Sequence, residues 1–113
     1  MQLAWLGDAV WELHQRLRCC GQPARSRNLH QQVVATVKAA AQAKALTQLE
    51  HHLTDEERAL VRRGRNRAGR GPRNADPGVY GQATGFEALL GWLFLNDPPR
   101  LVELLDHLEA IAP

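Results

Sequence analysis

The sequence predicts an all-α protein with five or six helices. Apolar residues recur every three or four positions along most of the chain, which is the spacing of an amphipathic helix. Several of these patterns begin directly after an Asp, Ser or Thr, the residue types that cap helix N-termini. No segment has the sequence pattern typical of a strand. Because 113 residues suffice for one hydrophobic core but not for two, we expect a single domain over residues 1–113.

The first helix is predicted at the N-terminus. Its apolar residues form one narrow stripe, which we expect to face the core: Leu3, Leu6, Val10, Leu13 and Leu17. Gly21 and Pro23 follow, and both residue types end helices. The first helix should therefore end near residue 20.

Residues 28–53 are also predicted to be helical, because they are rich in alanine, glutamine and leucine. Ser26 is a candidate N-cap for this segment. β-Branched residues at 33–37 weaken its middle, since they lose side-chain freedom in a helix. We therefore expect two helices with a break near Thr36 rather than one long helix.

The C-terminal half has explicit signals for three helices. Thr54 and Glu57 have the spacing of a capping box, which predicts a helix to about residue 67. Residues 68–78 contain glycine and proline and are expected to form a basic loop. The Asp-Pro pairs at 76–77 and 97–98 each combine a cap with a first-turn proline. They predict two more helices, which end near residues 96 and 110.

Residues 58–73 concentrate the positive charge of the chain. Seven of these sixteen residues are arginine and none is acidic, although the net charge of the whole chain is only +2. The charge is therefore local, which fits a binding site for a polyanion. Guanidinium groups bind phosphates in a bidentate manner, so nucleic acid is the expected partner. The alternative is a solvated surface loop without a partner.

The cysteines indicate a reducing compartment. Cys19 and Cys20 are adjacent, so they could bridge only with strain, and the chain has no third cysteine. No apolar run approaches the roughly eighteen residues of a membrane span, and the N-terminus lacks a signal-peptide pattern. We therefore expect a cytoplasmic protein with no membrane contact.

Two acidic residues lie on the first predicted helix, away from its leucine stripe. Asp8 and Glu12 are one turn apart, so they share a face. One interpretation is that they are solvent-exposed acids of an amphipathic helix. Against it, Trp5 lies on the same side and Trp11 is close to it. Tryptophan on a polar face usually meets a partner, and a partner subunit is the most common one.

Glu87 lies at the edge of an apolar helical stripe formed by Val79, Ala83, Phe86, Leu90 and Phe94. A partly buried carboxylate is costly unless a cation or a hydrogen-bond donor meets it. A salt bridge or a hydrogen bond to the backbone would satisfy it. The other interpretation is a ligand for a hard metal ion, because Mg²⁺ takes carboxylate oxygens and water. Hydrolysis of a phosphodiester uses such a metal.

Two motifs resemble those of a known nuclease family. Residues 3–12 (LAWLGDAVWE) are similar to the signature helix of ribonuclease III, whose centre reads L-G-D-A-V. Residues 86–91 (FEALLG) resemble the second motif of that family. Four further segments, of which the last overlaps the second motif, look like the Mini-ribonuclease III branch, which has the catalytic domain without a separate double-stranded-RNA-binding domain: residues 29–30, 38–43, 62–66 and 83–87.

The resemblance implies an all-helical, homodimeric endoribonuclease that cleaves double-stranded RNA. Asp8 and Glu87 would be its catalytic residues and its ligands for Mg²⁺. The signature helices of this family pack across the two-fold axis, which would place four residues at the dimer interface: Trp5, Ala9, Trp11 and Glu12. The branch is associated with maturation of large-subunit (23S) ribosomal RNA precursors at a double-stranded stem, where a ribosomal protein is a candidate helper. Cleavage would leave 5′-phosphate and 3′-hydroxyl ends.

The chain departs from the family pattern in two respects. Ribonuclease III has acidic residues four positions before the signature aspartate and three before the second glutamate, where this chain has Ala4 and Thr84. We therefore expect more water in the metal shell and weaker Mg²⁺ binding. The signature begins at Leu3, whereas family members usually have a leading segment, so we expect either a shortened or a reannotated start.

Without a separate binding domain, the catalytic domain itself must hold the RNA. Duplex RNA is recognised mainly through phosphates and 2′-hydroxyls. The residues expected to do this are Lys38, Lys44, Arg62, Arg63, Arg65, Asn66, Arg67, Arg70, Arg73 and Asn74. The segment 62–74 lacks aromatic side chains on which single-stranded bases could stack, which favours a duplex.

Two other functions remain open from the sequence. One is a dimeric double-stranded-RNA-binding module of the same fold with weak cleavage, since the acidic residues are reduced. The other is a helical interaction protein whose arginine loop binds an acidic protein. The presence of both Asp8 and Glu87 favours the enzyme.

Overall fold

The computed structural model describes residues 2–20 and 35–111, and within them every regular element is helical. The elements are α1 (Gln2–Cys20), α3 (Ala35–Leu49), a 3₁₀ turn (Glu50–His52), α4 (Asp55–Arg67), α5 (Pro77–Asn96) and α6 (Pro98–Ile111). The predicted all-α class is confirmed. None of the helices in these two stretches is long and apolar enough to cross a membrane.

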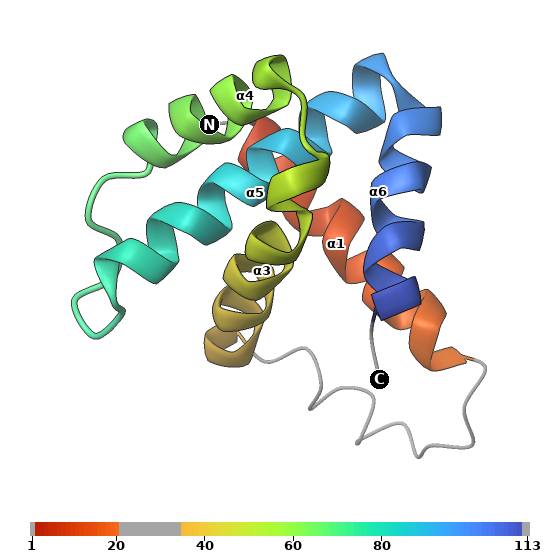
Figure 1. Cartoon of the computed structure of the whole chain (residues 1–113). Coiled ribbons are helices and arrows are strands. Elements are labelled where there is room, and N and C mark those ends of the chain that lie inside the picture. Colours follow the sequence, from red (N-terminus) through yellow and green to blue (C-terminus); the bar gives the residue numbers. More distant parts are fainter. Residues whose placement is uncertain (1, 21–34, 112–113) are drawn as a thin grey trace.

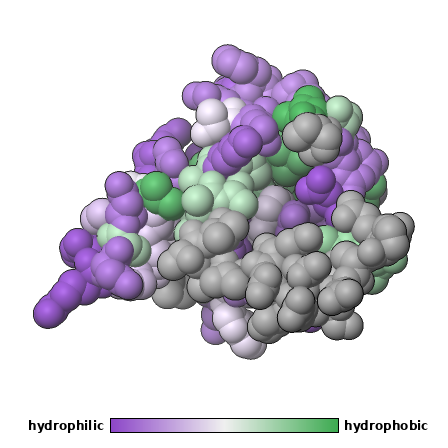
Figure 2. All heavy atoms as spheres, turned by 90° about the horizontal axis from the view of Figure 1, so that it is seen from below, coloured by the Kyte–Doolittle hydropathy of each residue, from purple (hydrophilic) through white to green (hydrophobic). Residues whose placement is uncertain are grey.

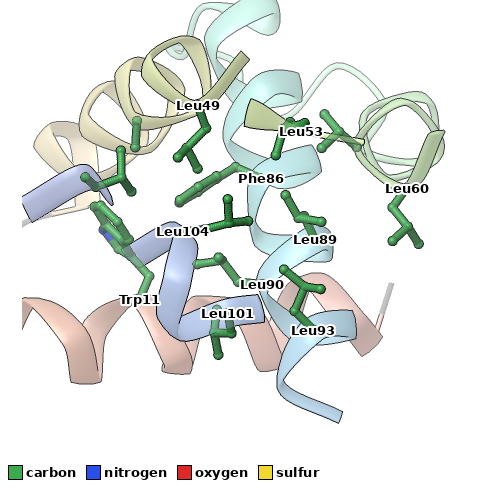
Figure 3. Close-up of a cluster of buried hydrophobic side chains, with 13 residues drawn as sticks. Trp11, Leu49, Leu53, Leu60, Phe86, Leu89, Leu90, Leu93, Leu101 and Leu104 are labelled. Atoms are coloured by element: carbon green, nitrogen blue, oxygen red, sulfur yellow. The ribbon is translucent and has the colours of Figure 1, made fainter. Parts of the chain in front are cut away.

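Helix α5 is the centre of the fold. In Figure 1 it runs through the middle of the molecule, and α1, α3 and α4 all pack against it. Its most deeply buried side chains include Phe86, Leu89 and Leu90. Figure 3 shows them together with Trp11 from α1 and Leu104 from α6, so one core joins the five helices. Such a helix, apolar on nearly all sides, must be enclosed by neighbours.

Glycines set how closely the neighbours approach α5. A Cβ atom built on Gly7 would overlap the backbone oxygen of Glu87, and one built on Gly91 would overlap the backbone oxygen of Leu3. Helices α1 and α5 therefore cross with their backbones in contact. On the side facing α4, a Cβ atom on Gly85 would come within 2.6 Å of the backbone oxygen of Val61. Any larger residue at these positions would push the helices apart.

The helix starts have the capping bonds that their sequences predict. The hydroxyl of Thr54 accepts a hydrogen bond of 3.1 Å from the amide of Glu57, whose carboxylate accepts one of 2.8 Å from the amide of Thr54. Asp76 accepts bonds from the amides of Gly78 and Val79 at the start of α5. The buried Glu57 also accepts two bonds of 2.9 Å from Arg100, which fasten α6 to α4.

The expected core stripe of α1 is wrong in its C-terminal half. Leu13 and Leu17 are 58% and 62% exposed, whereas Ala4, Gly7 and Trp11 are the buried residues of this helix. The cause is the close crossing at Gly7, because it turns the small-residue face of α1 toward α5. The expected signals at 21–26, and the segment before the expected break near Thr36, lie outside the described residues.

Candidate active site

Three helices bring charged and polar side chains together beside the crossing of α1 and α5. Asp8 follows Gly7 at the contact, and Glu87 projects from α5 at the same level. The ammonium of Lys38, on α3, donates a bond of 2.7 Å to Asp8 Oδ1 and one of 3.0 Å to Glu12 Oε1. Gln42 Nε2, also on α3, donates a bond of 3.1 Å to Glu87 Oε2.

The spacing of these residues explains why they meet. Asp8 and Glu12 are one turn apart on α1, and Lys38 and Gln42 are one turn apart on α3, so each pair presents one face. Glu87 stands between the two faces on α5. The site therefore depends on the packing of three helices.

The Glu87 carboxyl group has the strongest electrostatic perturbation at this site. Burial raises the pKa of Glu87 to about 7; the bond from Gln42 opposes this rise, while the charge of Asp8 and a hydrogen bond with it add to it. For Lys38, burial acts to lower the pKa, but the bonds to Asp8 and Glu12 outweigh it and the net pKa is raised. Within the described part of the chain, the single ammonium of Lys38 thus faces three carboxylates, those of Asp8, Glu12 and Glu87.

This donor set fits a hard divalent cation. Carboxylate oxygens are the ligands that Mg²⁺ prefers, and a cation between Asp8 and Glu87 would relieve the repulsion that contributes to the raised pKa of Glu87. Within residues 2–20 and 35–111, no group of three or more His, Cys, Asp or Glu side chains is arranged to hold a metal ion. Water would therefore have to fill most of the coordination shell, as Mg²⁺ commonly allows.

An open hollow of about 610 Å³ lies beside Glu87. Its walls come from α3, from the loop before α5 and from α5 itself, and they include Lys38, Gln42, Asn74 and Tyr80. The loop is fixed against Tyr80, because Gly71 has a φ of 82° and no room for a Cβ atom over the Tyr80 ring. The basic loop thus forms one wall of the acidic site.

The predicted RNA-binding side chains fall into several places. Arg65, Asn66 and Arg67 at the end of α4, and Arg70, Arg73 and Asn74 in the loop, are exposed. This loop forms the hydrophilic projection at the far left of Figure 2, the same end of the molecule as in Figure 1. Arg62 and Arg65 line a second hollow of about 300 Å³ that faces α3. Arg63 lines another hollow, together with Trp92 and Asp97.

The two lysines of α3 differ. Lys44 is exposed. Lys38, one of the expected RNA contacts, has its ammonium bonded to Asp8 and Glu12. It lies in the acidic site and not on the arginine surface.

The four predicted dimer-interface residues differ in their solvent exposure. Trp5 is 81% exposed, Ala9 is exposed and Glu12 is half-buried. Trp11 is only 6% exposed and packs edge-on against Phe86, with ring centroids 5.2 Å apart. Its assignment to the interface is wrong, since it rested on exposure and the side chain fills the core of its own chain. Leu13 and Leu17 are the exposed apolar residues that continue the face of Trp5 and Ala9.

Comparison with known proteins connects this geometry to a family. The Ribonuclease III domain matches residues 1–98. A protein of Gloeobacter violaceus named Mini-ribonuclease 3 is 56% identical over 91% of this chain and 76% of its own length. A protein of the same name from Synechococcus sp. is 53% identical over 94% of this chain and 77% of its own. A Fusobacterium nucleatum crystal structure superposes with a TM-score of 0.80 and 27% identity, and covers 94% of this chain and 87% of that one.

The chain belongs to the ribonuclease III family. It is therefore an endoribonuclease. The match covers α1 to α5 entirely, and these helices contain every residue of the acidic site.

Two acidic positions of the ribonuclease III pattern are occupied here by Ala4 and Thr84. The Thr84 hydroxyl donates a bond of 2.9 Å to the backbone oxygen of Tyr80, so it is turned into its own helix. Ala4 is buried where α1 packs. Polar groups reach the two remaining acids from α3 instead, through Lys38 and Gln42.

Sequence reasoning assigned no role to Gln42. This side chain is only 2% exposed and its amide holds the carboxylate of Glu87. A signal was present, because a glutamine one turn after Lys38 in an alanine-rich helix marks a polar face. Which acid it would meet could be known only from the packing of α3 on α5.

Proposed function

We propose that the chain is a magnesium-dependent endoribonuclease for double-stranded RNA, with Asp8 and Glu87 as metal ligands. The observation that supports this most directly is the placement of two acids from α1 and α5 side by side, with the pKa of Glu87 raised to about 7. When bound, Mg²⁺ would activate water and stabilise the charge that develops on the leaving oxygen. Gln42 would keep the Glu87 carboxylate directed toward Asp8.

The arginine segment would hold the duplex beside this site. The exposed guanidinium groups at the end of α4 and in the loop can contact phosphates, and the loop borders the hollow that contains Glu87. Lys44 adds an exposed positive charge on α3. Loop and site are therefore close enough for one duplex to reach both.

The active form would be a homodimer that packs through the outer face of α1. Trp5, Ala9, Leu13 and Leu17 recur every four residues, and all are exposed. An exposed apolar stripe of this kind marks a contact surface. Two copies would then present two acidic sites, one for each strand of the duplex.

The substrate that we propose is a double-stranded stem of a 23S ribosomal RNA precursor in the cytoplasm, with a ribosomal protein as a candidate helper. The support is the similarity to the Mini-ribonuclease III branch, together with relatives that bear the name Mini-ribonuclease 3. A catalytically weak RNA-binding module remains the alternative, because the acids at positions 4 and 84 are replaced by alanine and threonine.

The decisive experiment compares cleavage of a long RNA duplex by the wild type and Asp8→Asn, with and without Mg²⁺. We expect wild-type cleavage only with Mg²⁺, with 5′-phosphate and 3′-hydroxyl ends. Asp8→Asn should be at least about a hundredfold slower, because it removes charge from the metal shell. The control is Asp106→Asn, an exposed acid on α6. A wild type that binds the duplex without cutting it would favour the weak module.

A further inference from the structure

Helix α3 places a cation at the oxygen that a metal ion would need. Lys38 Nζ lies 2.7 Å from Asp8 Oδ1 and 3.0 Å from Glu12 Oε1, so a single ammonium bridges two acids of α1. The Lys38 side chain is 18% exposed and each acid is 34% exposed, so solvent screens these pairs only in part. Ion pairs that are partly removed from solvent generally interact more strongly than fully exposed ones.

The ammonium and a divalent cation cannot share Asp8 in this geometry. Mg²⁺ binds a carboxylate oxygen at about 2.0–2.1 Å. An ammonium 2.7 Å from the same oxygen would bring two positive charges within a few ångströms of each other. At such a distance the repulsion amounts to several kcal/mol, even with the effective dielectric constant of about 20 that applies near a protein surface.

Lys38 has room to move away. It also lines the open hollow of about 610 Å³ beside Glu87. Its flexible four-carbon chain can turn the ammonium from the acids toward this space without any movement of α3.

We propose that Lys38 is a tethered counter-ion that occupies the place of the divalent cation, and that cation binding at Asp8 must displace it. This inference rests on the proposed function, since it takes Asp8 as a metal ligand. Competition from Lys38 gives a second reason to expect weak metal binding, besides the absence of acids at positions 4 and 84. Metal binding at this site is then an exchange of one cation for another.

Removing the ammonium should therefore strengthen metal binding. Lys38→Met should bind Mn²⁺ at least about tenfold more tightly than the wild type, because the competing charge is gone. Lys38→Gln serves as a second variant, since its amide can still bond the acids if the apolar methionine disturbs folding. Lys44→Met is the matched control: it removes the same charge from the same helix, at an exposed position.

The test is calorimetric titration of the full chain with Mn²⁺ in the absence of RNA, with folding checked by circular dichroism. We expect tighter binding in both Lys38 variants, little change in Lys44→Met, and loss of binding when Asp8→Asn is added. If the Lys38 variants bind like Lys44→Met or more weakly, Lys38 is not a competitor and the inference is overturned. If Asp8→Asn leaves wild-type Mn²⁺ binding unchanged, the metal site at Asp8 is wrong, and the proposed function fails with it.

Discussion

Replacing Glu87 by glutamine should stabilise the metal-free protein at pH 8 while abolishing cleavage. Burial raises the pKa of Glu87 from 4.5 to about 7, and the neighbouring Asp8 adds to the rise. The charged form is therefore disfavoured in the folded state, and a difference of this size corresponds to at most about 3.5 kcal/mol. Because the carboxyl group is only partly buried, solvent screening reduces the expected gain to about 1–2 kcal/mol.

The direction of the pH dependence follows from the raised pKa. Below about pH 4.5 Glu87 is protonated in both the folded and the unfolded chain, so the variant and the wild type should be similar. Between about pH 4.5 and pH 7 Glu87 is ionised in the unfolded chain but still protonated in the folded one, so the wild type loses stability that the glutamine variant keeps. The advantage of the variant should grow between these values and then level off.

Thermal denaturation in EDTA at pH 5 and pH 8 measures this difference. A gain of 1–2 kcal/mol should raise Tm by roughly 5–10 °C at pH 8, with a smaller rise at pH 5. Glu56→Gln is the control, because Glu56 is an exposed glutamate on α4. An equal shift in Tm at both pH values, or a less stable variant at pH 8, would show that the charge of Glu87 does not destabilise the folded chain.

Three further predictions concern the crossing, the duplex and the dimer. Gly7→Ala should destabilise the fold by about 1–3 kcal/mol and stop cleavage, because its Cβ atom would overlap the backbone of Glu87. Gly78→Ala is the control for both denaturation and activity, because a Cβ atom at Gly78 would meet no backbone atom of another helix. Replacing Arg65, Arg67, Arg70 and Arg73 together by alanine should lower duplex affinity, and the slope of log affinity against log salt concentration should become shallower by up to about four. Cleavage should recover at saturating RNA. A single-turnover rate that saturation does not restore would contradict this division between binding and chemistry. Trp5→Ser should shift sedimentation from dimer to monomer at micromolar concentration, and a monomeric wild type would remove the basis for the dimer.

The helix boundaries of the C-terminal half could be predicted because they depend on local chemistry. The capping box at Thr54 and the Asp-Pro pair at Asp76 act within four residues, so sequence alone contains the whole signal. The buried face of α1 could not be predicted in this way. Leucine outnumbers glycine on that helix, yet Gly7 decides which side meets α5, because only a glycine permits the backbone contact.

The residues of the candidate site could likewise be predicted only in part from the sequence. Asp8 and Glu87 were identified through motifs of the family, since their separation in sequence gives no indication that they meet. The roles of Lys38 and Gln42 required the position of α3, because a lysine and a glutamine on an alanine-rich helix fit a solvated face equally well. The placement of Trp11 failed for a similar reason: tryptophan suits a core and an interface alike, and here it fills the core against Phe86.

The balance of charge at the crossing favours a divalent cation over a monovalent one. With Glu87 ionised, Asp8, Glu12 and Glu87 contribute three negative charges and Lys38 one positive charge, so the metal-free site has a net charge of −2. Because the incoming ion displaces Lys38 from Asp8, a monovalent ion would only replace the charge of the ammonium and leave the net charge at −2, whereas a divalent ion would reduce it to −1. If that ion displaces Lys38, the ammonium turns toward the hollow beside the basic loop, where its charge is available to a phosphate group. The same lysine would then stabilise the acids before metal binds and the RNA afterwards.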